Sequence, residues 1–172
     1  RPARLDPAVP IEETIGAIAD MVDAGHVRAI GLSEVGPETI RRAASVHPVA
    51  DLQIEYSLMS RGIETEILPT VRELGIGITA YGVLSRGLIS DSLRTGPLPA
   101  GDIRAGSPRF HGENLDRNRA LVERLASIAT AKGVTVAQLA IAWVLSRGDD
   151  IVPLIGTTHP DRLAQAVQAT TI

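Results

Sequence analysis

The sequence contains no cysteine among its 172 residues. This absence excludes disulfides, thiolate nucleophiles and cysteine-based metal sites, and we expect no bound metal. The formal net charge is only −3, so the chain has no strong basic field and we expect no nucleic-acid partner. No apolar run reaches the roughly 20 residues of a membrane span, so we expect no membrane partner either.

Lysine is also scarce, because Lys132 is the single lysine among 17 basic residues. It stands just before Gly133, where a helix is predicted to end, and a cation in the last helical turn interacts favourably with the helix dipole. We therefore interpret Lys132 as structural. The chain then offers no buried lysine of shifted pKa, and we assign no catalytic residue to it.

The apolar pattern predicts alternating helices and strands. We expect helices over 11–25, 37–47, 63–75 and 114–132, then a helix through 145 that starts at a Thr135–Gln138 capping box, and a last helix from Pro160. We expect strands over 27–32, 50–56, 76–82 and 151–155. The stretch 85–113 is rich in Gly, Pro, Ser and Arg and is predicted to be a functional or mobile loop.

This order of elements predicts an α/β fold with parallel strands and right-handed crossovers. A doubly wound sheet is one alternative, but the G-x-G-x-x-G turn of such folds is absent. Gly31–Gly36 and Gly82–Gly87 match G-x-x-x-x-G without the Lys-Ser or Lys-Thr of a P-loop. The other alternative is half of an eight-stranded barrel, which binds phosphate after its seventh and eighth strands.

Polar and aromatic residues gather where the predicted strands end. These are Ser33, Gln53 with Tyr56, the stretch 81–87, and Gly156-Thr157-Thr158. Structural roles remain open for them: a helix cap at Ser33, backbone partners for Gln53, core packing of the tyrosines, and capping of the last helix by Thr158 and Asp161.

As a set, these residues fit a nucleotide cofactor. A flat ring can lie on a tyrosine, and Ser and Gln can hold a carboxamide with both donors and acceptors. Backbone amides of a glycine loop and a helix N-terminus receive phosphate. The planar fork of Arg162, one turn into the last helix, can grip a terminal phosphate.

Four motifs carry a family resemblance: G-L-S-E-V, Q-I-E-Y-S-L, Y-G-V-L-S-R-G and P-L-I-G-T-T-x-P-x-R-L. From Asp6 through Val167 the chain resembles the C-terminal half of an aldo-keto reductase. The resemblance implies that residues 1–172 form the C-terminal half, about four strands, of a single parallel (β/α)8 TIM barrel. The N-terminal half, with the catalytic Asp, Tyr and Lys, would then be absent from this chain.

The N-terminal stretch RPARLDPAVP has the form of neither a signal peptide nor a natural start. We therefore expect a fragment of a longer cytoplasmic enzyme, inactive by itself. Pro2-Ala3 stands where many family members carry a catalytic His, which puts polarisation of the substrate in question.

The resemblance implies an oxidoreductase that uses NADP(H) to reduce aldehydes or ketones to alcohols. Ser33 and Gln53 would hold the nicotinamide carboxamide, and Tyr56 would stack under its ring. The residues around the pyrophosphate would be Tyr81, Gly82, Val83, Leu84, Ser85, Gly87 and Leu88. The adenosine 2′-phosphate would meet Ile155, Gly156, Thr157, Thr158 and Arg162, with Gln165 near the adenine.

Two departures from the family leave the preference for NADPH over NADH open: His159 replaces a common Lys and Ala166 a common Asn. An alternative function is a regulatory, non-catalytic barrel subunit that keeps the nucleotide and loses the chemistry. The carbonyl substrate and the oligomeric state also stay open.

Overall fold

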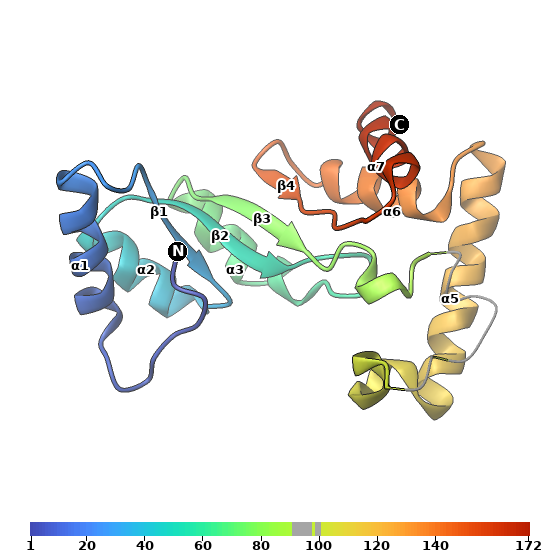
Figure 1. Ribbon diagram of the computed structural model, residues 1–172, viewed down its shortest axis with the longest axis horizontal. Helices are drawn as coiled ribbons and strands as arrows, with labels where there is room; N and C mark the ends of the chain where they lie inside the picture. The colour runs from blue at the N-terminus through green and yellow to red at the C-terminus, as the bar shows by residue number, and fades with distance from the viewer. Residues whose placement is uncertain (91–97, 99–100) are drawn as a thin grey trace.

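A four-stranded parallel sheet forms the centre of the computed structural model, which describes residues 1–90, 98 and 101–172 (Figure 1). The strands follow one another in chain order as β1 (Ile30–Ser33), β2 (Val49–Glu55), β3 (Gly77–Tyr81) and β4 (Ile151–Pro153). Every neighbouring pair is parallel, which confirms the predicted alternation. The carboxyl ends of the four strands therefore lie at the same edge of the sheet.

The helices also follow the predicted order. They are α1 (Ile11–Asp23), α2 (Pro37–Val46), α3 (Ile67–Glu73), α5 (Gly112–Ala131), α6 (Val136–Leu145) and α7 (Pro160–Gln168). Short 3-10 turns lie between them: η1 (Gly62–Glu64), η2 (Ser85–Gly87), η3 (Ile103–Gly106), η4 (Pro108–Phe110) and η5 (Ala169–Thr171). The predicted loop over 85–113 contains η2, η3 and η4, and its residues 91–97 and 99–100 lie outside the described residues.

Several boundaries differ from the prediction by a few residues, and two of these differences have a clear backbone reason. The first strand begins at Ile30 because the amides of His26 and Val27 bond to the Met21 carbonyl at the end of α1. The predicted helix over 63–75 divides into η1 and α3, and Pro69 lies in the first turn of α3, where no amide hydrogen is required. The last strand ends at Pro153, two residues before the predicted end, although the Leu154 amide still donates to the Ala80 carbonyl of β3 at 2.8 Å.

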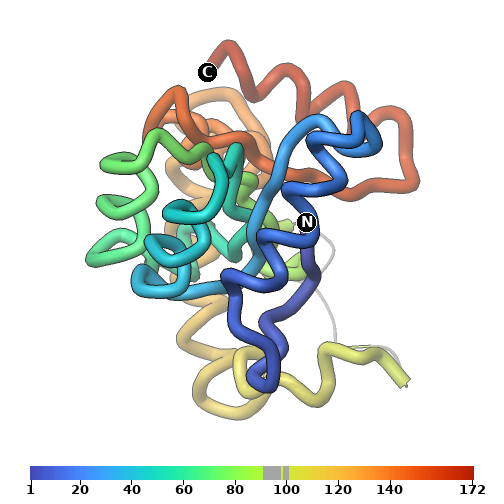
Figure 2. Tube along the Cα trace, turned by 90° about the vertical axis from the view of Figure 1, so that its left-hand side faces the viewer, coloured from blue at the N-terminus to red at the C-terminus, as the bar shows by residue number. Residues whose placement is uncertain are grey.

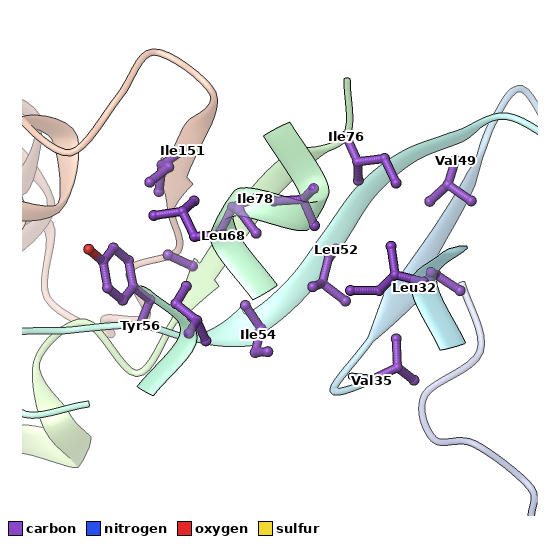
Figure 3. Packing of buried hydrophobic residues seen from close by; sticks show 14 of the residues in the cluster. Leu32, Val35, Val49, Leu52, Ile54, Tyr56, Leu68, Ile76, Ile78 and Ile151 are labelled. Carbon is purple, nitrogen blue, oxygen red and sulfur yellow. The ribbon is translucent and has the colours of Figure 1, made fainter. Parts of the chain in front are cut away.

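The two faces of the sheet differ in polarity because side chains alternate along each strand. In β2, Leu52 and Ile54 are buried, whereas Asp51 and Gln53 are half-buried on the opposite face. The apolar face packs on α1, α2 and α3, which lie side by side (Figures 1 and 2). Figure 3 shows this core from close by. The polar face is the one that can present side chains to a ligand.

A second, smaller core lies beyond the sheet. It joins the loop after β3 (Leu88 and Ile89) to Phe110, to α5 through Val122 and to α6 through Val136. Figure 1 places α5 at the far end of the molecule from α1. This second core holds α6 beside the strand ends, and α6 in turn contacts β4 and α7.

Among the described residues no single helix is long and apolar enough to span a membrane. Only α5 and α6 taken together reach that length and hydropathy, and they form a pair bent by 88°.

Candidate functional site

A cavity of about 750 Å³ opens beside the carboxyl ends of β3 and β4. Its walls come from the loop after β3, the first turns of α6, the segment after β4 and the first turns of α7. The lining residues are Gly82, Val83, Leu84, Arg86, Gly87, Ser90, Thr135, Ala137, Gln138, Ile141, Leu154, Ile155, Gly156, Thr157, Thr158, Arg162, Gln165 and Ala166. The structure thus brings together the two predicted phosphate-binding segments, which are far apart in sequence.

The charge of the lining favours an anionic ligand. Arg86 and Arg162 are its charged residues, and none of the described lining residues is Asp or Glu. Arg162 lies in the first turn of α7, where the helix dipole disfavours a cation. Helix stability therefore does not explain this arginine, whereas a bound phosphate would.

The loop after β3 has an unusual backbone. Gly82, Ser85, Arg86 and Gly87 all have left-handed dihedrals, with φ of +69°, +50°, +58° and +88°. A Cβ at Gly82 would stand 3.0 Å from Cγ of Glu55, so the chain passes close to the end of β2. Non-glycine residues in this conformation are strained and concentrate at ligand sites. The loop geometry agrees with the predicted approach of backbone to a ligand.

Two predicted contacts in this loop have other roles in the structure. Ser85 is fully buried, and its hydroxyl lies 3.2 Å from the hydroxyl of Ser57. Leu88 packs in the second core. Neither side chain lines the cavity. Ser85 and Leu88 instead stabilise the loop through contacts on the side away from the cavity.

The N-cap of α7 is His159 and not Thr158 or Asp161, the two residues considered as caps from the sequence. The His159 amide donates to the Thr157 hydroxyl at 3.1 Å. Within the described chain, neither Thr158 nor Asp161 makes a side-chain capping bond. The capping alternative is therefore wrong, and Thr158 stays exposed in the cavity wall.

A second group of predicted residues lies on the polar face of the sheet. Ser33 pairs with Gln53 across β1 and β2, and Glu55 pairs with Tyr81 across β2 and β3. Partners in register share a face, so Ser33, Gln53 and Tyr81 project to the same side. Oε1 of Gln53 accepts a hydrogen bond from Arg1 at 2.5 Å. These three side chains do not line the cavity.

The structure contradicts the expected stacking role of Tyr56. Its side chain is fully buried in the core under the sheet (Figure 3). Its ring centroid lies 5.4 Å from that of Trp143. The hydroxyl donates to Glu64 at 2.7 Å, and burial together with this bond raises the pKa of Tyr56. Tyr56 follows Gln53 by three positions, and an odd spacing places two strand residues on opposite faces. Tyr56 and Gln53 therefore cannot hold one ring together.

Tyr81 is the tyrosine on the polar face. Burial, the adjacent Glu34 carboxylate and the charge of Glu55 raise its pKa to about 12. Glu34 has a left-handed φ of +53°, and its carboxylate accepts the amide of Glu55 at 2.9 Å. Strand parity together with the observed register identifies Tyr81 as the tyrosine on the face of Gln53, because Gln53 pairs with Thr79 and Tyr81 lies two positions after Thr79.

Sequence reasoning missed the α6 wall of the cavity, and it included Arg86 in the stretch 81–87 without giving its side chain a role. Thr135, Ala137, Gln138 and Ile141 all contribute to that wall. The capping box at Thr135 and Gln138 is confirmed, and it marked the start of α6. Only the packing of α6 beside β4 places that start at the cavity, and no local pattern encodes such packing.

Comparison with known proteins agrees with this geometry. The model of the family described as "Aldo/keto reductase family" matches residues 3–172. A protein from Glycine max, "Probable aldo-keto reductase 1", is 46% identical over 166 residues, which is 96% of this chain and 48% of that protein.

Solved structures agree as well. The glycerol dehydrogenase from Gluconobacter oxydans superimposes with a TM-score of 0.87 at 30% identity, over 94% of this chain and 49% of that one. An aldo/keto reductase from Klebsiella pneumoniae, solved with NADP and acetate, has a TM-score of 0.71 at 26% identity, over 95% and 50% of the two chains. The chain thus spans about half the length of these relatives.

Proposed function

The chain belongs to the aldo/keto reductase family, and on that premise we propose that it provides the cofactor-binding part of an NADP(H)-dependent oxidoreductase that reduces aldehydes or ketones to alcohols. The family match supports the reaction class. The Klebsiella pneumoniae structures in complex with NADP and NADPH support the cofactor.

The observation that carries the proposal is the cavity lined by two arginines and, among its described residues, by no carboxylate. Its glycine loop, exposed Thr158 and Arg162 suit an extended anion better than a neutral ligand. We propose that Arg162, with residues 155–158, holds the 2′-phosphate of the adenosine and that the 82–87 loop lies along the pyrophosphate. Gln165 would face the adenine.

The nicotinamide end belongs to the polar face of the sheet in this proposal. Ser33 and Gln53 are in register there and offer donors and acceptors to a carboxamide. Tyr81 takes the stacking role first given to Tyr56, because its ring stands on the same face as Gln53. Glu34 beside the Tyr81 hydroxyl would fix the orientation of that ring.

When bound, NADPH supplies a hydride for the carbonyl carbon of the substrate. The residues of this chain hold and orient the cofactor, and we assign the proton donor to none of the described residues. A neutral tyrosine suits the face of an aromatic cofactor, and Tyr81 is neutral at physiological pH, as an ordinary tyrosine is.

Replacement of Arg162 by Ala tests the proposal. We expect NADPH binding to weaken by about 1.5–3 kcal/mol, roughly ten- to a hundredfold, because a charge-assisted contact to phosphate is lost. NADH binding should change little, since NADH has no 2′-phosphate. Titration of cofactor fluorescence measures both. Arg117→Ala, at an exposed arginine of α5 paired with Glu113, is the matched control. Equal losses for the two cofactors would refute the role of Arg162.

A further inference from the structure

We propose that Gln138 of α6 is a positioning residue that holds α7 in the orientation in which Arg162 reaches the cavity. This inference rests on the proposed function, because it assigns to Gln138 a part in selecting NADPH over NADH. Gln138 also lines the cavity, but its side-chain amide is engaged with protein atoms.

Helix α7 is held to the rest of the protein by little apolar contact. The whole helix lies in the described part of the chain, and none of its side chains is fully buried. Leu163 and Val167 are 53% and 61% exposed. Ala166 packs on the main core, and the buried Ala169 follows the helix. Apolar burial alone therefore fixes the angle of α7 weakly.

Gln138 supplies a polar connection from α6 to this helix. Its side chain is only 8% exposed, and Nε2 donates to the carbonyl of Gln165 at 3.2 Å and to Oε1 of Gln168 at 3.3 Å. The carbonyl of Gln165 is among the last four of α7, and the C-cap amide of Ala169 donates to the carbonyls of Ala166 and Val167 instead. The amide of Gln138 thus caps the end of α7.

The other end of the same amide caps α6. Oε1 of the Gln138 side chain accepts a hydrogen bond from the backbone amide of Thr135 at 2.9 Å. The Thr135 hydroxyl accepts one from the backbone amide of Gln138 at 3.1 Å. This capping box fixes the orientation of the Gln138 side chain, so that its Nε2 faces the end of α7. An unsatisfied buried donor is costly, so α7 is favoured in the position that satisfies Nε2.

Arg162 depends on this connection because it lies on the same short helix. It precedes Gln165 by three residues, about one helical turn. A rotation of α7 about its attached end would move the Arg162 guanidinium relative to the 155–158 segment. Gln138 therefore acts on the ligand through Arg162.

Gln138→Glu separates the two roles of the side chain. Glutamate at this position keeps the acceptor of the capping box but removes both Nε2 hydrogens and places a carboxylate against the Gln165 carbonyl. We expect the Kd for NADPH to rise about three- to tenfold, as for the loss of hydrogen bonds of ordinary strength, with a much smaller rise for NADH. Hydrogen exchange of the α7 amides, measured without cofactor, should become faster.

Two further variants keep the test decisive. Gln168→Ala, at an exposed position, removes one acceptor of Nε2 and should shift the NADPH preference in the same direction by less. Val122→Ala, in the second core, should lower thermal stability and leave the ratio of the two Kd values unchanged. A change of that ratio in Val122→Ala would show that general destabilisation suffices, and would overturn the inference.

The double variant Gln138→Glu with Arg162→Ala completes the experiment. If Gln138 acts through Arg162, the double variant binds NADPH no more weakly than Arg162→Ala alone. Additive losses, or an unchanged ratio of Kd values in both Gln138→Glu and Gln168→Ala, would overturn the inference and leave the proposed function standing. An unchanged ratio in Arg162→Ala would instead refute the proposed function.

Discussion

The two ends of the candidate site are built in different ways. At the sheet end, Ser33, Gln53 and Tyr81 stand on three neighbouring strands, and backbone hydrogen bonds fix their register. At the phosphate end, Thr158 and Arg162 stand on an exposed segment and on a helix with no fully buried side chain among its described residues.

Because of this difference, we expect different substitutions to change the stability of the fold and the affinity for the cofactor. The hydrogen bonds and core that place Gln53 and Tyr81 are also those that hold the sheet together, so the sheet end is preorganised by folding itself. The phosphate end depends on a few polar contacts, such as those of Gln138. Substitutions in the core under the sheet should therefore affect unfolding first, and substitutions at the phosphate end should affect affinity first.

The largest expected effect comes from Tyr56, which the structure places in the core rather than in the site. Tyr56→Ala should lower the free energy of unfolding by about 3–5 kcal/mol, the usual cost of deleting a fully buried aromatic ring. Tyr56→Phe removes the hydrogen bonds of the hydroxyl, chiefly the one to Glu64, which keeps Arg61 as a partner at 2.8 Å, and should cost about 1 kcal/mol. Urea denaturation followed by circular dichroism measures both values.

The binding side of this prediction is sharper. Tyr56→Phe should leave the Kd values for NADPH and NADH unchanged, because the ring lies under the sheet and Gln53 lies above it. A clear loss of cofactor affinity in a folded Tyr56→Phe protein would mean that the two faces of β2 have been assigned the wrong way round.

The sequence predicted the fold better than it predicted the site. Pro37, Pro160 and the capping box at Thr135 mark helix starts, and such local signals depend on the few residues around them. The strand-end motifs also identified two segments that the structure brings together at one cavity. The error at Tyr56 arose from reading residues near a strand end as one group, although neighbouring strand residues face opposite ways.

The contribution of α6 to the site could not be predicted in the same way. Gln138 approaches α7 because α6 packs against β4 and α7. Gln138 and Gln165 lie 27 positions apart in the chain, and the pattern around Gln138 specifies only its own helix cap.

The next largest expected effect comes from Tyr81. Its substitution can be compared with that of Arg162, because the two residues are assigned to opposite ends of the cofactor. Tyr81→Ala should weaken NADPH and NADH binding equally, by about 1 kcal/mol, because the nicotinamide ring is common to both cofactors. Tyr81→Phe keeps the ring and serves as the control. Unequal losses for the two cofactors, as expected for Arg162→Ala, would place Tyr81 at the phosphate end instead.

The smallest expected effect is the pH dependence of the sheet end. The pKa of Tyr81 is raised to about 12, chiefly by burial and then by the Glu34 carboxylate. A raised folded-state pKa means that the folded protein keeps its phenol proton where the unfolded chain has lost it. The resulting stabilisation is complete below the ordinary tyrosine pKa of about 10 and is lost as the pH rises toward 12.

Tyrosinate absorbance in a Tyr56→Phe background isolates this titration, because Tyr56 and Tyr81 are the two tyrosines of the chain. Glu34→Gln removes the charge beside the phenol, so it should lower the pKa of Tyr81 while burial continues to hold it above its ordinary value. If the pKa of Tyr81 did not change in Glu34→Gln, Glu34 would not interact with the Tyr81 hydroxyl. Only the strand register would then position the residues of the sheet end, and no side-chain contact with Glu34 would fix the orientation of the Tyr81 ring.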